Sequence, residues 1–415
     1  MTPPSAAAKL AERLPFTAQY PELGTGPLSV DPIINPDYFE LERDRLFKKV
    51  WLKVGRVEEI PEPGDFKVKR LDVARTAAIL VRGKDGNIRA FHNICPHRGN
   101  KVVPETGNET FGRARANVLT CRFHGWVFDT AGPVKSIPRE ENFADIDRAC
   151  LGLRPIHCDV WQGFIFINLD DKPQQTLAEY LGGMGDHFAG YPYGESTVSY
   201  RYYSILNCNW KVALYAFTEG YHVATIHAAT FPSLAKLEHT HFNIYGPHST
   251  STLFVPPVPG LKPTPATAIF GKLLRESEVH RPRLDQLPPK INAEKRTDFQ
   301  FEFPTFFPNF LIHLGSGNGY PGMTYFTHQF WPLAHNQTLW EGTNYFRPPT
   351  KPSERIAIAH VNALHRNAWL EDTSTMEDTQ EALESKVLTE MVLMDEELMI
   401  RNTDYHWHKY LGLNQ

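Results

Sequence analysis

The chain contains 415 residues, more than one typical domain needs, so about two or three domains with buried cores are expected. Its 43 basic and 47 acidic residues give a formal net charge of −4, which leaves no basic excess of the kind that indicates nucleic-acid binding. The N-terminus has no basic start followed by an apolar core, and no run approaches ~18 apolar residues, so we expect neither secretion nor membrane insertion but a cytoplasmic protein.

The N-terminal part predicts an irregular arm followed by a helix. Residues 1–35 are rich in Pro, Ala and Gly, which disfavour regular structure. Asn35 is a suitable N-cap and Pro36 a suitable first helical residue, and apolar residues recur near helical spacing as far as Val50. We expect a helix of about three or four turns here, and we group residues 1–44 as arm and helix.

Short strand-like runs, rich in β-branched and aromatic residues, dominate the next part of the chain. They are residues 51–54, 65–68, 76–81, 88–91, 127–128, 156–160 and 164–168. Turn-forming residues separate them, and Asp85-Gly86 is a hairpin signal. The pattern predicts a small antiparallel domain over residues 45–168, ended by the turn-rich residues 170–173.

A second domain is predicted over residues 169–415. Its expected helices are 176–181, 207–225 and 353–399, and its expected strands are 198–206, 299–314, 325–331 and 338–346. The stretch from Pro232 to Arg296 predicts loops that form a lid or an insertion, because it contains a proline-rich run at residues 256–260.

Two short motifs lie between the fourth and fifth strand-like runs. They are Cys95-x-His97 and Cys121-x-x-His124. Two thiolates and two imidazoles are the donors needed when one iron of a 2Fe-2S cluster takes sulfur ligands and the other takes nitrogen ligands. Zinc also accepts two Cys and two His, but ordinary zinc motifs pair like with like, whereas each loop here offers one of each.

This pattern resembles the Rieske cluster motif, which implies that Cys95, His97, Cys121 and His124 bind a Rieske-type 2Fe-2S cluster. The segment between the two halves looks several residues longer than is usual in that family, and its polar residues from Gly107 to Arg115 predict a solvated excursion. The remaining cysteines are most simply free thiols in a reducing compartment: Cys150, Cys158 and Cys208.

Two further histidines, His222 and His227, lie five residues apart. On a regular helix that spacing separates them by about 140°, so they converge only if the helix is distorted or ends between them. Alone, the pattern fits two ordinary histidines beside a core. With Asn209-Trp210-Lys211, Glu219 and Tyr221 before it, and with the cluster motif, the chain resembles the Rieske non-haem iron oxygenases. That resemblance implies that both histidines bind a mononuclear Fe(II).

The resemblance assigns the third iron ligand to an Asp in a late segment, followed five residues later by an acid. Asp372 fits, because Glu377 follows at that spacing, and Asp378 does not, because the fifth residue after it is Leu383. The acidic residues between positions 371 and 384 are also typical of a solvated helix face. Because Asp372 fits the count that the resemblance gives, we take it as the third ligand. Two imidazoles and one carboxylate on one face of the iron leave positions open for oxygen and substrate.

The resemblance also implies an α+β fold, in which a small antiparallel Rieske 2Fe-2S domain joins a larger helix-grip-like antiparallel domain that holds the mononuclear iron. Family members are often homotrimers, or trimers with a second subunit type, in which a cluster approaches a neighbour's iron. Glu219, three residues before His222, would share a helix face with it. We interpret Glu219 as the catalytic residue that links a neighbour's His124 to the iron site, against the alternative of a solvated helix acid. Most members have Asp there, and Glu resembles the branch that includes quaternary-ammonium oxygenases.

The predicted function is that of a terminal oxygenase component, an enzyme that uses O2 and electrons from NAD(P)H to hydroxylate an aromatic or similar apolar substrate by cis-dihydroxylation or monooxygenation. A separate reductase, with or without a ferredoxin, would supply the electrons, because the chain has no dinucleotide-binding fingerprint after a strand. The alternatives are an oxidative O- or N-demethylase, a quaternary-ammonium oxygenase, a Rieske electron carrier without oxygenase activity, and a zinc-stabilised binding protein. Some of six aromatic residues are expected to line the cavity beside the iron: Phe217, Phe303, Phe307, Phe310, Phe326 and Trp331.

Overall fold

The computed structural model describes residues 14–234, 238–255, 260, 262, 264–277, 287–315 and 324–413. The chain divides into two compact units. The N-terminal unit consists of residues 39–197 and 331–334, and the C-terminal unit of residues 1–38, 198–330 and 335–415. The domain boundary predicted at residues 168 and 169 therefore lies inside the N-terminal unit. None of the helices in the described ranges is both long enough and apolar enough to cross a membrane.

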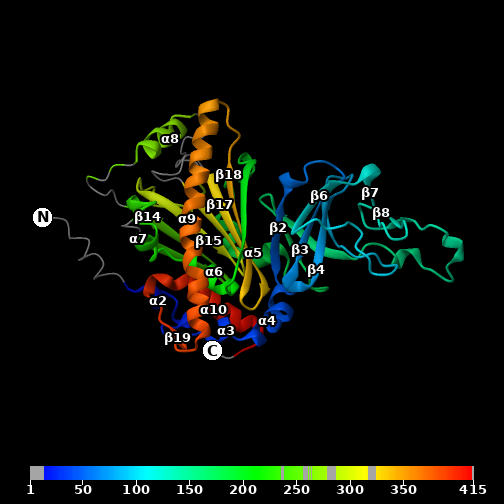
Figure 1. The fold of residues 1–415 in the computed structure, drawn as a ribbon, viewed down its shortest axis with the longest axis horizontal. Helices are drawn as coiled ribbons and strands as arrows, with labels where there is room; N and C mark the ends of the chain where they lie inside the picture. The colour runs from blue at the N-terminus through cyan, green and yellow to red at the C-terminus, as the bar shows by residue number, and fades with distance from the viewer. Residues whose placement is uncertain are drawn as a thin grey trace. The chain divides into compact units, whose positions relative to one another are not determined.

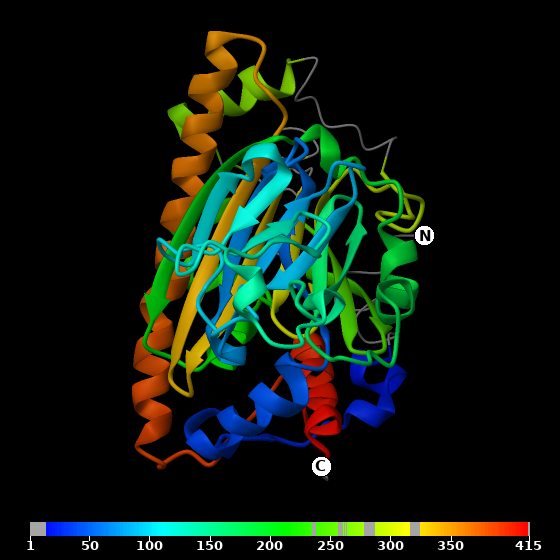
Figure 2. The ribbon, with the colours of Figure 1, turned by 90° about the vertical axis from the view of Figure 1, so that its right-hand side faces the viewer.

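The N-terminal unit is built on two antiparallel sheets, whose strands are drawn from blue through cyan to green in Figure 2. Its elements are β2 (Trp51–Arg56), β3 (Asp65–Leu71), β4 (Thr76–Arg82), β5 (Ile88–His92), β6 (Glu109–Arg113), β7 (Val118–Thr120), β8 (Val127–Asp129), β9 (Val134–Ser136), β10 (Pro155–Trp161), β11 (Phe164–Asn168) and α5 (Leu177–His187). The larger sheet has the order β2-β11-β10-β5-β4-β3-β6, and the smaller has the order β7-β8-β9. Every strand-like run predicted for this part of the chain is confirmed.

The segment predicted as a solvated excursion contains the strand β6, whose residues 111–113 are exposed as predicted but whose first residue joins a cluster of buried charges. Glu109 pairs with Lys69 of β3 in register, and its Oε1 lies 3.1 Å from Nζ of Lys69 and 2.8 Å from Nζ of Lys67. Both lysines are at most 2% exposed. The strand escaped prediction because buried ion pairs give it a polar sequence, and charges that are buried in pairs are uncommon in strands.

The C-terminal unit is built on one seven-stranded antiparallel sheet of order β12-β18-β17-β16-β15-β14-β13. Its strands are β12 (Val198–Leu206), β13 (Glu238–Tyr245), β14 (His248–Phe254), β15 (Phe299–Phe306), β16 (Phe310–Gly315), β17 (Thr324–Ala334) and β18 (Gln337–Phe346). Its main helices are α6 (Trp210–Ala216), α7 (Val223–Ile226), α8 (Pro265–Arg275), α9 (Pro352–Glu384) and α10 (Leu398–Leu411). Figure 1 shows α9 as the long orange helix beside this sheet, where it contacts β12.

The N-terminal arm is more regular than predicted within its described part. It contains α2 (Phe16–Gln19), β1 (Leu28–Ser29) and α3 (Asp31–Ile34), and β1 pairs with β19 (Glu390–Met391). Phe16 is buried against Phe242, with ring centroids 4.5 Å apart. Residues 1–13 lie outside the described part. The helix predicted from Pro36 is present as α4 (Pro36–Glu42) and a π turn to Phe47, and the backbone N–H of Asp37 donates to Asn35 Oδ1 at 3.0 Å, as expected of an N-cap.

Two long predicted helices are shorter in the structure. The helix predicted over 207–225 is interrupted at residues 217–222, between α6 and α7. The helix predicted over 353–399 ends at Glu384, and α10 begins only at Leu398. In the first case the helical spacing of apolar residues continued into the turn, where Phe217 is buried. In the second case the residues between Glu384 and Leu398 are exposed or half-buried, so no buried face extends the helix there.

The stretch predicted as loops from Pro232 to Arg296 contains β13, β14 and α8, so that prediction is wrong for its described part. All seven residues of β14 are buried although five of them are His, Ser or Thr. A strand buried on both faces shows no alternation, and its polar side chains concealed its burial in the sequence. The proline-rich residues 256–259, on which the expectation of a lid rested, lie outside the described residues.

Candidate metal centres

The two Cys-His loops of the N-terminal unit have the same backbone fold. Cys95 follows β5, and Cys121 lies between β7 and β8. In each loop the cysteine N–H donates to the carbonyl of the fifth following residue, at 2.7 and 2.9 Å. Gly99 and Gly125 then donate back to the two cysteine carbonyls at 2.9 and 3.0 Å, with φ of +74° and +75°. This positive φ, which only glycine adopts readily, is a sufficient reason for a glycine in each loop.

The four predicted cluster residues meet as two like pairs. The sulfur atoms of Cys95 and Cys121 are neighbours in the core, and both residues are 1% exposed. Nδ1 of His97 lies 3.1 Å from Nδ1 of His124, and His124 is exposed. This donor set fits a 2Fe-2S cluster with sulfur ligands on its buried side and nitrogen ligands toward the surface. Burial raises the pKa of the Cys95 thiol to about 11, so its thiolate needs a bound cation.

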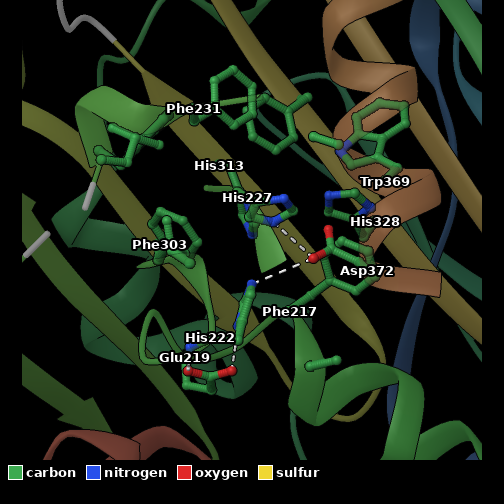
Figure 3. A pocket seen from close by; sticks show the side chains of 16 residues that line it. Phe217, Glu219, His222, His227, Phe231, Phe303, His313, His328, Trp369 and Asp372 are labelled. Carbon is green, nitrogen blue, oxygen red and sulfur yellow. Dashed lines mark hydrogen bonds and ion pairs between the residues drawn. The ribbon is translucent and has the colours of Figure 1, made fainter. Parts of the chain in front are cut away.

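The second candidate centre lies in the C-terminal unit, where three side chains converge (Figure 3). His222 directly precedes α7, His227 directly follows it, and Asp372 lies on α9. One ligand atom from each residue lies within 4.8 Å of the other two. Oδ1 of Asp372 is 2.8 Å from Nε2 of His227 and 3.4 Å from Nε2 of His222. The helix thus ends between the two histidines, which is one of the conditions predicted for their convergence.

A carboxylate orients each imidazole from its far side. Nδ1 of His222 contacts Glu219, and Nδ1 of His227 lies 2.8 Å from Glu371 Oε2. Both rings therefore present Nε2 to Asp372, the orientation that metal-ligating histidines take when a carboxylate holds the other nitrogen. Sequence reasoning missed this role of Glu371. The only available signal was its place beside Asp372.

The donor set fits a divalent metal ion. Asp372 is 5% exposed, and although two imidazoles are near, its Oδ1 has no well-aligned hydrogen bond from the described residues. Burial by itself would lower the pKa of His222, but the adjacent carboxylates of Asp372 and Glu219 raise it to about 10. The site thus favours a positive charge, and a metal ion bound there would displace the proton.

Their positions on α9 distinguish Asp372 from Asp378, the alternative third ligand. Asp378 is exposed, whereas Asp372 faces the two histidines. Glu219 does not share a helix with His222 as predicted, because residues 217–222 form the turn between α6 and α7. Its Oε2 instead accepts the backbone N–H of His222 at 3.2 Å, which explains how Glu219 still contacts the imidazole.

Contacts between α6 and α9 hold the two halves of this site together. Asn209 caps α6 by accepting the N–H of Lys211 at 2.9 Å, and its own N–H donates to Gln380 of α9 at 2.9 Å. Glu377 accepts the N–H of Asn207 at 2.7 Å. Trp210 is fully buried. The Asn-Trp-Lys motif and the acid five residues after Asp372 therefore fix the position of α6 on α9.

A cavity of about 550 Å³, including its open mouth, adjoins the three converging residues (Figure 3). Its wall is mainly aromatic. Three of the six predicted aromatic residues line it, namely Phe217, Phe303 and Phe326. The other three are buried at other places in the fold: Phe307, Phe310 and Trp331.

Two family models match the chain. The model described as the Rieske [2Fe-2S] domain matches residues 50–151, and the model described as the ring hydroxylating alpha subunit (catalytic domain) matches residues 193–412. Among curated relatives, the alpha subunit of 2-aminobenzenesulfonate 2,3-dioxygenase from Alcaligenes sp is 34% identical over 42% of this chain and 43% of its own length. The oxygenase subunit of carnitine monooxygenase from Escherichia coli (strain K12) is 31% identical over 46% of this chain and 49% of its own length. Each match therefore spans less than half of the relative.

Solved structures share the fold over nearly the whole chain. A quaternary ammonium Rieske monooxygenase in complex with L-carnitine superposes with a TM-score of 0.72 at 19% identity, over 96% of this chain and 99% of the other. Naphthalene 1,2-dioxygenase from Rhodococcus sp. bound to indole gives a TM-score of 0.70 at 19% identity, over 93% and 94% of the two chains. With a Rieske [2Fe-2S] domain, and with a catalytic-domain model that matches more than half of its residues, the chain belongs to the family of ring-hydroxylating alpha subunits.

Proposed function

We propose that this protein is the terminal oxygenase component of a Rieske non-haem iron oxygenase that hydroxylates an aromatic or similar apolar compound. The observation that carries the proposal is the convergence of His222, His227 and Asp372 beside an aromatic cavity. Two imidazoles and one carboxylate on one side of an iron leave the opposite positions free. In the same chain, the Cys-His loops offer the donors of an electron-carrying cluster.

Each predicted ligand has a defined part in this proposal. Cys95, His97, Cys121 and His124 would hold the 2Fe-2S cluster, and the triad described above would hold Fe(II). When bound, the cluster supplies single electrons and the mononuclear iron supplies open coordination positions for oxygen. Glu371 and Glu219 keep the two imidazoles turned toward the metal. The aromatic wall excludes water and binds the apolar part of the substrate.

Glu219 is the proposed link for electron transfer between subunits. Its carboxylate contacts His222, and the exposed imidazole of His124 is available to another molecule. In a trimer, His124 of a neighbouring subunit would hydrogen-bond Glu219 and so connect the cluster with the iron site. A separate reductase, with or without a ferredoxin, would deliver electrons from NAD(P)H.

A quaternary-ammonium oxygenase is the second candidate. Glu219 stands where most family members have Asp, and the chain is 31% identical to the carnitine monooxygenase subunit over the matched region. Aromatic faces such as those of Phe217 and Trp369 in the cavity can also bind an ammonium cation.

Metal analysis and a substrate screen test the proposal. We expect red-brown protein with three irons per chain, two from the cluster and one from the mononuclear site, and a Rieske-type EPR signal after reduction. Turnover with a surrogate reductase is then scored by product mass against aromatic compounds and quaternary amines. Two irons per chain would identify an electron carrier, and zinc without iron would identify a zinc-stabilised protein.

A further inference from the structure

Two histidines that are not predicted metal ligands line the cavity. His313 lies on β16 and is 4% exposed, and His328 lies on β17 and is fully buried. Figure 3 shows both on the cavity wall, His313 near His227 and His328 near Asp372. Nε2 of each ring is buried without a hydrogen-bond partner among the described residues. A buried polar atom without a hydrogen-bond partner destabilises a fold, so a ligand that supplies a partner for either atom gains a hydrogen bond.

The neighbour of His328 determines which ring nitrogen carries its proton. Nε1 of Trp340 donates a hydrogen bond to Nδ1 of His328 at 3.1 Å. Because the indole N–H can only donate, Nδ1 of His328 must be unprotonated. The proton of the neutral ring is therefore on Nε2. His328 offers the cavity a hydrogen-bond donor.

His313 has the opposite arrangement. Its ring forms a hydrogen bond with the backbone of Phe217, and this bond acts to raise the pKa of His313. A hydrogen bond that favours protonation of the ring is one in which a ring N–H donates and the Phe217 carbonyl accepts. Since Nε2 is the unpartnered atom, Nδ1–H is the donor. Nε2 of His313 is thus unprotonated and offers the cavity a hydrogen-bond acceptor.

Packing keeps both rings neutral and in place. Burial lowers the pKa of His313 to about 3 and holds that of His328 well below its usual value. The ring of Phe303 lies 3.9 Å from His313, and that of Phe217 lies 4.2 Å from His328, centroid to centroid. The donor and the acceptor therefore have fixed positions, on rings whose centroids are 5.1 Å apart.

We propose that His328 and His313 recognise a neutral substituent that both accepts and donates a hydrogen bond, namely a hydroxyl or primary amino group on an aromatic ring. The hydroxyl or amine would accept from Nε2–H of His328 and donate to Nε2 of His313. A carboxylate has no proton to donate, and a quaternary ammonium group has neither a proton nor a lone pair. This inference rests on the proposed function in one respect, that the cavity beside the triad holds the substrate.

Ligand binding to the purified holoprotein, measured by anaerobic calorimetry, tests the inference without turnover. The ligands are phenol, which can use both histidines, anisole, which can only accept, and toluene, which can do neither. His328→Asn keeps an acceptor near Nδ1 for Trp340 but removes the Nε2 donor. It should weaken phenol and anisole binding roughly tenfold, as expected for one lost hydrogen bond, and toluene binding less than about twofold.

The second position gives a different ligand pattern. His313→Asn keeps a donor for the Phe217 carbonyl but removes the Nε2 acceptor, so it should weaken phenol binding roughly tenfold and leave anisole binding nearly unchanged. The Gln variants at both positions carry an amide near the Nε2 position and should restore most of the phenol affinity. His360→Asn is the control, because His360 also has an unpartnered Nε2 but packs against Phe270 of α8, away from the cavity.

Equal losses for phenol and toluene in the Asn variants would overturn the inference, because they would show a packing role only. Unchanged phenol binding in both variants would also overturn it, because water would then satisfy both atoms. The inference would also be overturned if phenyltrimethylammonium bound more tightly than phenol and neither variant changed its affinity. That result would indicate a quaternary-ammonium site. Selective phenol binding without any oxygenated product would leave this inference standing and overturn the proposed function.

Discussion

Glu371 and Asp372, adjacent on α9, contact the two nitrogens of one imidazole. Oε2 of Glu371 is 2.8 Å from Nδ1 of His227, and Oδ1 of Asp372 is 2.8 Å from Nε2 of the same ring. One turn of one helix therefore supplies both a proposed metal ligand and the group that orients a second ligand. This relationship makes the site sensitive to the rotation of α9.

Glu371→Gln should weaken the binding of the mononuclear iron about 10- to 100-fold, because the neutral amide makes His227 a poorer ligand. The measurement is competition for Fe(II) with a calibrated chelator, with the cluster absorbance as an internal reference. Glu381→Gln is the matched control, because Glu381 is an exposed acid on the same helix. Equal iron affinity in Glu371→Gln and the native protein would show that Glu371 does not support the metal.

Asp372→Ala should remove the mononuclear iron and leave the cluster spectrum intact, because two imidazoles alone hold Fe(II) weakly. Iron content should fall from three to two per chain in this proposal. Asp378→Ala, which changes an exposed acid six residues further along α9, should retain all three. The opposite result in the two variants would mean that the third ligand is assigned to the wrong residue.

Glu219→Gln should stop electron transfer to the iron site while both centres stay bound. The substitution keeps the volume of the side chain but removes its charge, and a hydrogen bond to a charged group is worth about 1.5 to 3 kcal/mol. The quantity to measure is single-turnover oxidation of a pre-reduced cluster in the presence of substrate and oxygen. Native rates of cluster oxidation and native product yield would show that electrons take another route.

Glu109→Gln should destabilise the N-terminal unit by about 3 to 5 kcal/mol, because it leaves the buried Lys69 without the carboxylate. Calorimetric or denaturant unfolding of the holoprotein measures the difference. Arg113→Ala is the control, because Arg113 lies on the same strand as Glu109 but is exposed, so its ion pair with Asp65 of β3 should matter little. A loss no larger than that of Arg113→Ala would show that the buried cluster of charges adds no stability.

The same carboxylate should make stability depend on pH. Burial would raise the pKa of Glu109, but Lys69 and Lys67 lower it to about 2. Because this value lies below the unfolded value of about 4.3, the stabilisation is complete above pH ~4.5 and is lost as the pH falls through about 2. Stability measured between pH 5 and 2.5 should therefore fall less steeply in Glu109→Gln than in the native protein. Parallel curves would contradict this.

The sequence by itself determined the features that depend on neighbouring residues. Cys95 and His97, like Cys121 and His124, lie in one tight loop each, and the glycine that closes the loop is visible in the sequence. Seven strands of the N-terminal unit alternate or run apolar between clear turns, so their positions were predictable, whereas β6, β7 and β9 were not predicted. These are local properties, which do not depend on how distant parts of the chain pack.

Only the tertiary structure decided which distant residues join these motifs. Successive residues on a helix point in directions about 100° apart. Which acids of α9 face the two histidines, here Asp372 and Glu371, therefore depends on how α9 packs. His313 and His328 come from neighbouring strands and had no motif at all. Their proposed roles arise because β18 brings Trp340, and the turn after α6 brings the Phe217 backbone, to one nitrogen of each ring, and the other nitrogen has no partner among the described residues. Burial of a polar atom is a property of the whole fold, and no local pattern of residues reports it.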